Sequence, residues 1–216
     1  MRELLQYHIR LEFRKKSIFL SLLLYLISLV FINYLAVGTT ALPGPTIWSA
    51  LFWMALLSTL THAIAKSFLN DRPGQIIYFY NLVSPTQIIF SKIIYGFFLC
   101  VGISLVGYLF FSLWLTNPIQ NTSVFLLTLI LSSFGFSASL SILSAIASKT
   151  INGSMVMAIL SFPIMISILL MSIKITKNCI DGLGWDASID ELLTLTAINI
   201  LATAFSYLLF PYIWRS

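Results

Sequence analysis

Residues 92–115 read KIIYGFFLCVGISLVGYLFFSLWL, and the stretch carries one charge, Lys92, at its first position. About 20 apolar residues in a helix cross the roughly 30 Å hydrocarbon core of a bilayer. A β-barrel strand would be shorter and would alternate apolar with polar residues, which this stretch does not do. Residues 92–115 are therefore predicted to form a membrane-spanning helix, with Lys92 near the membrane boundary.

Similar apolar stretches occupy most of the chain and are separated by turn-forming segments such as LPGP at 42–45. Hydrophobic residues make up 59% of the sequence and charged residues 9%, a balance that soluble domains do not show. The sequence predicts an all-α integral membrane protein, one domain over residues 1–216, surrounded by the lipid bilayer. The predicted spans are 17–36, 46–65, 92–115, 123–147, 153–173 and 190–213.

The distribution of charge predicts which side faces the cytoplasm. Six spans place both termini on one side, and of the twelve basic residues only Lys174 and Lys177 fall in loops on the other side. Basic residues concentrate in cytoplasmic loops, so both termini are predicted to be cytoplasmic. The loop 174–191 also carries four acidic residues, and topology alone explains the net charge of +5, so we expect no nucleic-acid partner.

The segment 66–91, KSFLNDRPGQIIYFYNLVSPTQIIFS, is the longest predicted cytoplasmic connection. Its RPGQ suits a type II turn, and QIIYFYNLV is too short to span the bilayer and too aromatic for a solvated loop. A short interfacial helix that ends before Pro85 is predicted. It is either a connector anchored by its tyrosines or a coupling element on which a soluble partner acts, and composition does not separate the two.

The segment 1–16 precedes the first span and gathers apolar residues on one helical face and basic residues on the other. It is predicted to lie in the membrane interface as a helix, with Arg10, Glu12 and Arg14 as its candidate contact residues. At the other end of the chain, the spacing of Ser188 and Glu191 predicts a capping box that starts the last span.

The spans lack the residues that intramembrane chemistry needs. No Asp or Glu falls inside them beyond Asp190 and Glu191 at the very start of the last span, and the chain has no G-x-S-x-G, H-E-x-x-H or Gly-rich phosphate loop. Catalysis by this chain, a proton pathway and a metal site are therefore not expected. His62 has no second ligand at a suitable spacing, so a packing role is favoured over haem or metal ligation, and Cys100 and Cys179 fall in no metal or redox spacing.

The fourth span repeats a small residue every four positions. Small side chains at i and i+4 let two helices approach closely, either within the bundle or between two copies of the chain. The predicted helix-packing residues are Ser133, Ser137, Ser141 and Ala145.

The order of these features resembles the CcmB family, also called haem exporter protein B. The resemblance covers nearly the whole chain and is carried by IRLEFRKK (9–16), WMALLSTL (53–60), FLNDRPGQIIYFYNLVSPTQIIFSK (68–92) and ASKTINGSMVMAILSFPIMI (147–166). Two features depart from the family pattern. An acidic Asp-Gly-x-Leu-Glu-Gln-like run is replaced by DRPGQIIYFY (71–80), and the fifth span has only one proline, Pro163.

The resemblance implies an ABC-2 type permease fold with an N-terminal interfacial helix, six spans and a coupling helix between the second and third spans. It implies a multi-pass protein of the bacterial inner membrane that forms a homodimer with two copies of a CcmA-like ATPase, beside CcmC-like and CcmD-like membrane proteins. The family acts in cytochrome c maturation, where ATP hydrolysis in the partner would drive haem export or release of a haem-loaded CcmE-like chaperone. The residues implied in coupling are Lys66, Asn70, Asp71, Arg72, Pro73, Gly74, Gln75, Tyr78 and Tyr80.

Under this hypothesis the chain binds no cofactor of its own, ATP acts through the partner subunit, and haem is a transported or handled ligand whose site is unknown. Two alternatives stay open. The chain is an ABC-2 type exporter permease for a lipid, polysaccharide or drug, or it is a membrane scaffold without transport. Neighbouring genes separate the first alternative from the cytochrome c hypothesis, and ATPase stimulation on reconstitution separates the second.

Overall fold

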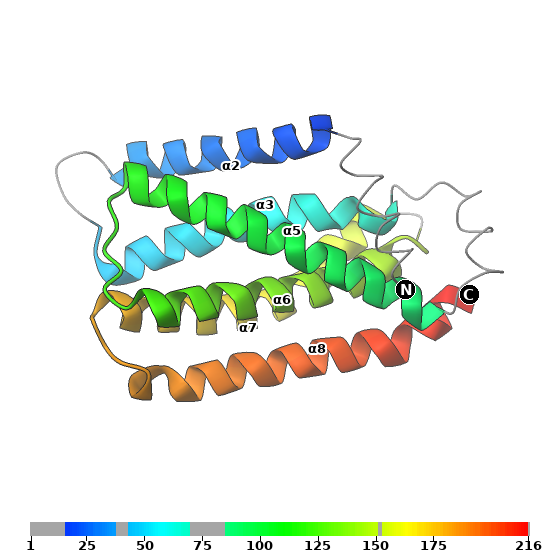
Figure 1. The fold of residues 1–216 in the computed structure, drawn as a ribbon. Helices are drawn as coiled ribbons and strands as arrows, with labels where there is room; N and C mark the ends of the chain where they lie inside the picture. Colours follow the sequence, from blue (N-terminus) through cyan, green and yellow to red (C-terminus); the bar gives the residue numbers. More distant parts are fainter. Residues whose placement is uncertain (1–15, 38–42, 70–84, 151–152, 216) are drawn as a thin grey trace.

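The computed structural model describes residues 16–37, 43–69, 85–150 and 153–215, and within these ranges the chain forms helices and no strand. Six of the helices are long and apolar enough to cross a membrane (Figure 1), which confirms the predicted all-α membrane fold. The elements are α2 (Lys16–Val37), α3 (Pro45–Leu69), α5 (Pro85–Trp114), α6 (Thr122–Ala147), α7 (Gly153–Ile180), η1 (Asp186–Ser188) and α8 (Ile189–Arg215).

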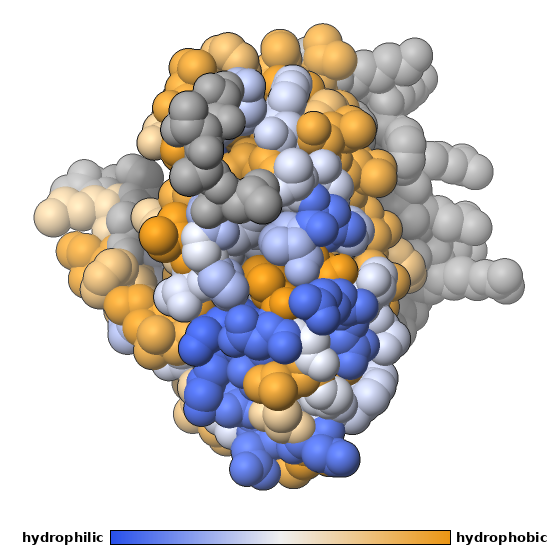
Figure 2. All heavy atoms as spheres, turned by 90° about the vertical axis from the view of Figure 1, so that its left-hand side faces the viewer, coloured by the Kyte–Doolittle hydropathy of each residue, from blue (hydrophilic) through white to orange (hydrophobic). Residues whose placement is uncertain are grey.

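The helices run side by side, so the bundle has two ends (Figure 1). The two ends differ in charge. At one end α3 and α6 finish and α5 begins, and we call it the basic end because Lys66, Lys92 and Lys149 lie there. The other we call the acidic end, because the segment 181–191 brings four carboxylates to it. Figure 2 looks onto the acidic end and shows hydrophilic side chains gathered over part of it.

Three helices extend well beyond the predicted spans. α7 continues to Ile180 where an end at 173 was predicted, because its last turns bury Ile175 and Cys179 and expose Lys174 and Lys177. This amphipathic pattern keeps the charged side chains out of the bundle, and Cys179 lies in the helix rather than in a loop. α3 continues to Leu69 and α5 begins at Pro85, so residues 66–69 and 85–91 of the predicted cytoplasmic segment belong to these two helices.

α6 lies at the centre of the bundle and packs against α3, α5, α7 and α8. Within its span 72% of the residues are buried, compared with 17% for α2, whose main contacts among the described helices are with α3 and α5. Small side chains explain the central position, because Ser and Gly let the neighbouring backbones approach from several sides.

Aromatic side chains fill the acidic half of the interior. The ring of Phe52 on α3 lies 5.4 Å from Trp48, 5.3 Å from Phe111 on α5 and 5.6 Å from Phe125 on α6, measured between centroids. Phe52 stacks on Trp48 and meets Phe111 edge to face, and rings at these separations bury large areas and attract one another. This cluster joins α3, α5 and α6.

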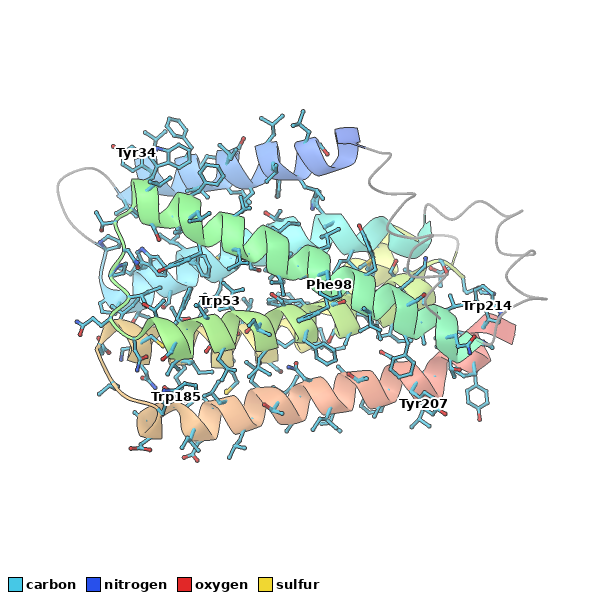
Figure 3. The ribbon with its side chains drawn as sticks, viewed as in Figure 1. Tyr34, Trp53, Phe98, Trp185, Tyr207 and Trp214 are labelled. Carbon is cyan, nitrogen blue, oxygen red and sulfur yellow. The ribbon has the colours of Figure 1, made fainter. Side chains whose placement is uncertain are left out.

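The outer surface of the bundle is apolar along its length and aromatic towards both ends. Leu113, Phe162 and Leu193 are 77%, 68% and 64% exposed, as expected for side chains that face lipid tails. Figure 3 shows Tyr34 and Trp185 towards the acidic end and Tyr207 and Trp214 towards the basic end. Aromatic rings at the two headgroup levels are typical of a membrane-spanning bundle.

Candidate functional site

The predicted coupling segment joins α3 to α5 at the basic end. Lys66 lies in the last turns of α3. The other coupling candidates, Asn70, Asp71, Arg72, Pro73, Gly74, Gln75, Tyr78 and Tyr80, lie outside the described residues, as do Arg10, Glu12 and Arg14. The structure therefore shows the two helices that carry the segment, and the segment's own role stays a prediction.

The start of α5 is embedded in the bundle. Ile88, Ile89, Ser91 and Lys92 are all buried, and the Ser91 hydroxyl donates to the carbonyl oxygen of Ile88 at 2.8 Å. Lys92 was predicted near the membrane boundary, and the structure shows that its side chain is buried in the bundle, at 4% exposure. A force applied to the segment before Pro85 would therefore act on a buried helix end rather than on a free one.

The predicted packing stripe of α6 lies inside the bundle. All four of its residues, Ser133, Ser137, Ser141 and Ala145, are buried. The Ser137 hydroxyl donates to the carbonyl oxygen of Ile93 on α5 at 2.6 Å, and the Ser133 and Ser104 hydroxyl oxygens are 3.4 Å apart. The stripe serves contacts within the chain, because its surface is not available to a second copy.

Further polar contacts join α7 to its neighbours. The Trp53 indole N–H on α3 donates to the Thr176 hydroxyl at 2.9 Å, and the hydroxyl oxygens of Ser132 on α6 and Ser172 on α7 are 2.6 Å apart. Sequence reasoning did not find these contacts. Single hydroxyls in apolar spans are a weak signal, since Ser and Thr can also bond within their own helix.

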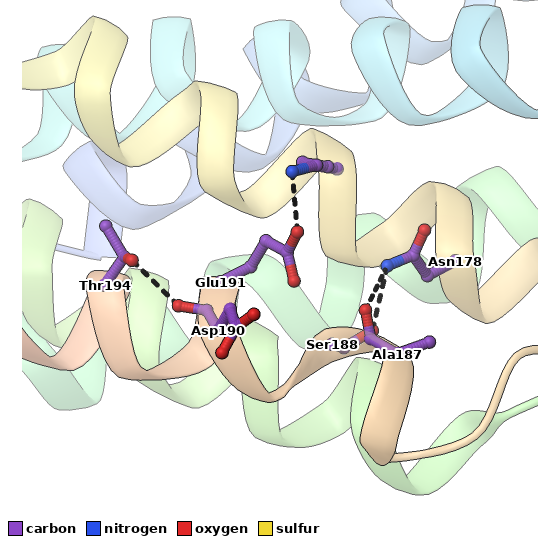
Figure 4. A network of polar contacts seen from close by, with 7 residues as sticks. Asn178, Ala187, Ser188, Asp190, Glu191 and Thr194 are labelled. Carbon is purple, nitrogen blue, oxygen red and sulfur yellow. Dashed lines mark hydrogen bonds and ion pairs between the residues drawn. The ribbon is translucent and has the colours of Figure 1, made fainter.

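The acidic end is organised by the α7–α8 hairpin (Figure 4). Lys174 Nζ and Glu191 Oε1 are 2.7 Å apart, and the Asn178 amide donates to the Ala187 carbonyl and to the Ser188 hydroxyl, both at 3.1 Å. The Glu191 carboxylate thus pairs with Lys174 of α7. The capping-box spacing had instead predicted that it would bond back to Ser188. The loop is held at a fixed position on α7.

The turn before α6 contacts the same loop. The backbone N–H groups of Gln120 and Asn121 both donate to the Cys179 carbonyl oxygen, at 3.1 and 3.2 Å, and the Asn121 amide donates to the Leu183 carbonyl oxygen at 3.3 Å. The acidic end is therefore one connected polar surface built from the turns before α6 and α8.

The candidate ligands for haem or metal do not come together. His62 is exposed and stacks on Tyr25 of α2, with ring centroids 5.0 Å apart. Cys100 and Cys179 are buried free thiols. Over the described ranges, no group of three or more His, Cys, Asp and Glu side chains could hold a metal ion.

These contacts hold the helices of the bundle together. α3 ends and α5 begins at the basic end, and both helices pack on α6. α6 also contacts α7 and α8, whose connection lies at the acidic end. The described residues thus provide a continuous packed path between two polar ends across an apolar bundle.

Comparison with known families and proteins identifies the chain at the family level. A search of curated proteins finds no match. The model of the CcmB protein family matches residues 1–208, which is nearly the full length and includes all six membrane-spanning helices up to the last turns of α8. The chain is therefore a member of the CcmB family, an integral membrane permease with six transmembrane helices.

Proposed function

We propose that this chain is the membrane subunit through which a partner ATPase acts in cytochrome c maturation. The partner would dock at the basic end, on the segment between α3 and α5, and ATP hydrolysis would drive haem export or release of a haem-loaded chaperone on the other side. Haem is the cargo in this proposal, and the chain supplies no catalytic residue.

The family match over residues 1–208 carries this proposal. The fold agrees with it in one respect, because α3 and α5 both lead into the predicted coupling segment and both pack on α6. A partner that moves this segment acts on two helices at once, and close-packed helices shift as bodies rather than deform.

α5 is the most direct connection between the two sides. It has 30 residues, from Pro85 to Trp114, which at 1.5 Å per residue is about 45 Å. Its first turns are buried at the basic end, and Phe111 near its other end belongs to the aromatic cluster with Phe52 and Trp48. Displacement of its start would reach the packing beneath the acidic end without passing through a flexible connection.

The decisive experiment reverses one charge in the coupling segment. We expect Arg72→Glu to lower both the ATPase activity of the purified complex and the amount of holo-cytochrome c, while the level of the chain in the membrane stays unchanged. Lys177→Glu is the matched control, because it makes the same charge change at the acidic end, and it should leave ATPase activity near wild type. An Arg72→Glu complex that assembles and matures cytochrome c normally would refute the coupling role.

The same preparation separates the alternative functions. If the complex that contains the chain shows stimulated ATPase activity, but deletion of the chain from cells leaves cytochrome c maturation intact, the cargo is a lipid, polysaccharide or drug. If the chain supports maturation but does not alter the ATPase activity of its partner, it acts as a scaffold.

A further inference from the structure

Asn199 is a buried amide in the middle of α8. Its side chain is 3% exposed, and its Nδ2 group donates to the carbonyl oxygen of Leu131 on α6 at 2.9 Å. The other half of the carboxamide, Oδ1, is buried and has no hydrogen-bond partner among the described residues. An unpaired acceptor here is costly, because the surrounding lipid and apolar side chains offer it no donor.

The carboxamide lies against Gly135 of α6, at the junction with α7. A Cβ atom at Gly135 would be 2.3 Å from Asn199 Oδ1 and 3.2 Å from the Cδ1 atom of Ile168 on α7. Glycine is required here so that the amide can approach the α6 backbone closely. The free oxygen is therefore directed into the junction of α6, α7 and α8 and away from lipid.

A second unpaired group lies one helical turn away. The Ser139 side chain is 1% exposed, and in the part of the chain that the structure describes its hydroxyl has no hydrogen-bond partner. Residues i and i+4 share one face of a helix, so Ser139 lies next to Gly135 on the side of α6 that receives Asn199. A hydroxyl can donate one hydrogen bond and accept others, whereas the Asn199 oxygen only accepts.

We propose that one water molecule bridges Asn199 Oδ1 and the Ser139 hydroxyl inside the membrane-spanning bundle. The water would donate to the amide oxygen and accept from the hydroxyl. Four residues rise about 6 Å along α6, but side chains on a helix lean towards its N-terminal end, so the Ser139 hydroxyl lies closer to the level of Gly135 than its backbone does. A water with two hydrogen bonds of about 2.8 Å can join polar atoms about 4.5 Å apart. Buried waters make 2 to 4 bonds to otherwise unpaired polar groups, which is the situation of this pair.

The sign of a stability change tests the proposal. In the purified full-length chain, Ser139→Ala should lower the midpoint of thermal unfolding, because it removes one partner of the water and leaves the Asn199 oxygen unpaired. If Ser139 has no bridging water, the same change deletes an unpaired buried hydroxyl, and the midpoint should stay constant or rise. The second result would overturn the proposal.

Ser141→Ala is the matched control. Ser141 is also a buried α6 serine whose hydroxyl is unpaired within the described ranges, but two residues correspond to about 200° around the helix, so it faces away from Asn199. Its replacement should not lower the unfolding midpoint.

A double-substitution cycle with Asn199→Ala completes the test. Asn199→Ala removes the other end of the bridge and leaves more space at Gly135 rather than less. Ser139→Ala should have no further destabilising effect in that background. An equal loss in the presence and absence of Asn199 would show that the two groups are independent and would refute the bridge.

Discussion

Gly96 is a residue at which α5 approaches α6 closely. A Cβ atom there would be 2.6 Å from the Ser137 hydroxyl oxygen, and that oxygen is held by its bond to the Ile93 carbonyl. Gly96→Ala therefore forces either a helix shift or the loss of a buried hydrogen bond, and overpacking of this kind costs about 1–3 kcal/mol. The cost exceeds the roughly 1 kcal/mol that alanine gains over glycine in a helix. Unfolding of the purified chain in denaturant should show a net loss of stability.

Gly102 on the same helix provides the comparison, since a Cβ atom there meets nothing within 4 Å. Gly102→Ala should be neutral or stabilising by up to about 1 kcal/mol. Adding Ser137→Ala to Gly96→Ala should recover part of the loss, because the overlapping oxygen is gone. If the two glycine variants behave alike, α5 and α6 do not pack as described.

At this scale the sequence predicts which residues are small but not what they touch. The recurrence of Ser133, Ser137 and Ser141 marked α6 as a packing helix, and the structure places the stripe inside the bundle. Asn199 is also visible in the sequence as a lone amide in an apolar span, but its partners on α6 depend on helix rotation. Lys92 was expected at the interface, and only the surrounding fold shows that it is buried.

At the scale of helices, α3 is joined to α7 by the bond between the Trp53 indole and the Thr176 hydroxyl. A double-mutant cycle of Trp53→Phe and Thr176→Val should give a coupling free energy of about 0.6 kcal/mol, and at most about 1.7, as hydrogen bonds between membrane helices do. The measurement is the unfolding free energy of the four proteins in the same detergent. A coupling energy of zero would contradict the contact.

The ion pair between Lys174 and Glu191 joins α7 to α8 in the same way. Lys174→Met leaves Glu191, which is only 9% exposed, without its cation and should lower the unfolding free energy of the chain. Glu191→Gln in the Lys174→Met background should restore part of the loss, because it removes the uncompensated charge. Lys177→Met changes an exposed lysine on the same helix and should stay within about 0.5 kcal/mol of wild type.

Helix positions could be predicted because apolar length alone marks a membrane span. Which side of each helix is buried could not be predicted, since lipid tails are as apolar as leucine and the same residues suit the core and the outer surface. Leu60 is fully buried and Leu193 is 64% exposed, and nothing in their local sequence separates them. The extension of α7 to Ile180 was missed for a related reason, because its last turns are amphipathic and were interpreted as a polar loop.

Basic and acidic residues gather at opposite ends of the bundle, and this distribution predicts the orientation of the protein in the membrane. Lys92 and Lys149 lie at the basic end, and the segment 181–191 at the opposite end carries four carboxylates. Because cytoplasmic segments are enriched in Lys and Arg, the acidic end should face the outside. In intact spheroplasts, Asp181→Cys should react with a membrane-impermeant maleimide, whereas Thr150→Cys should react only after the membrane is opened. Cys100 and Cys179 are buried, so the unmodified chain should remain unlabelled and serves as the control. Labelling of Thr150→Cys but not Asp181→Cys in intact spheroplasts would invert the topology and place the segment between α3 and α5 out of reach of any cytoplasmic ATPase.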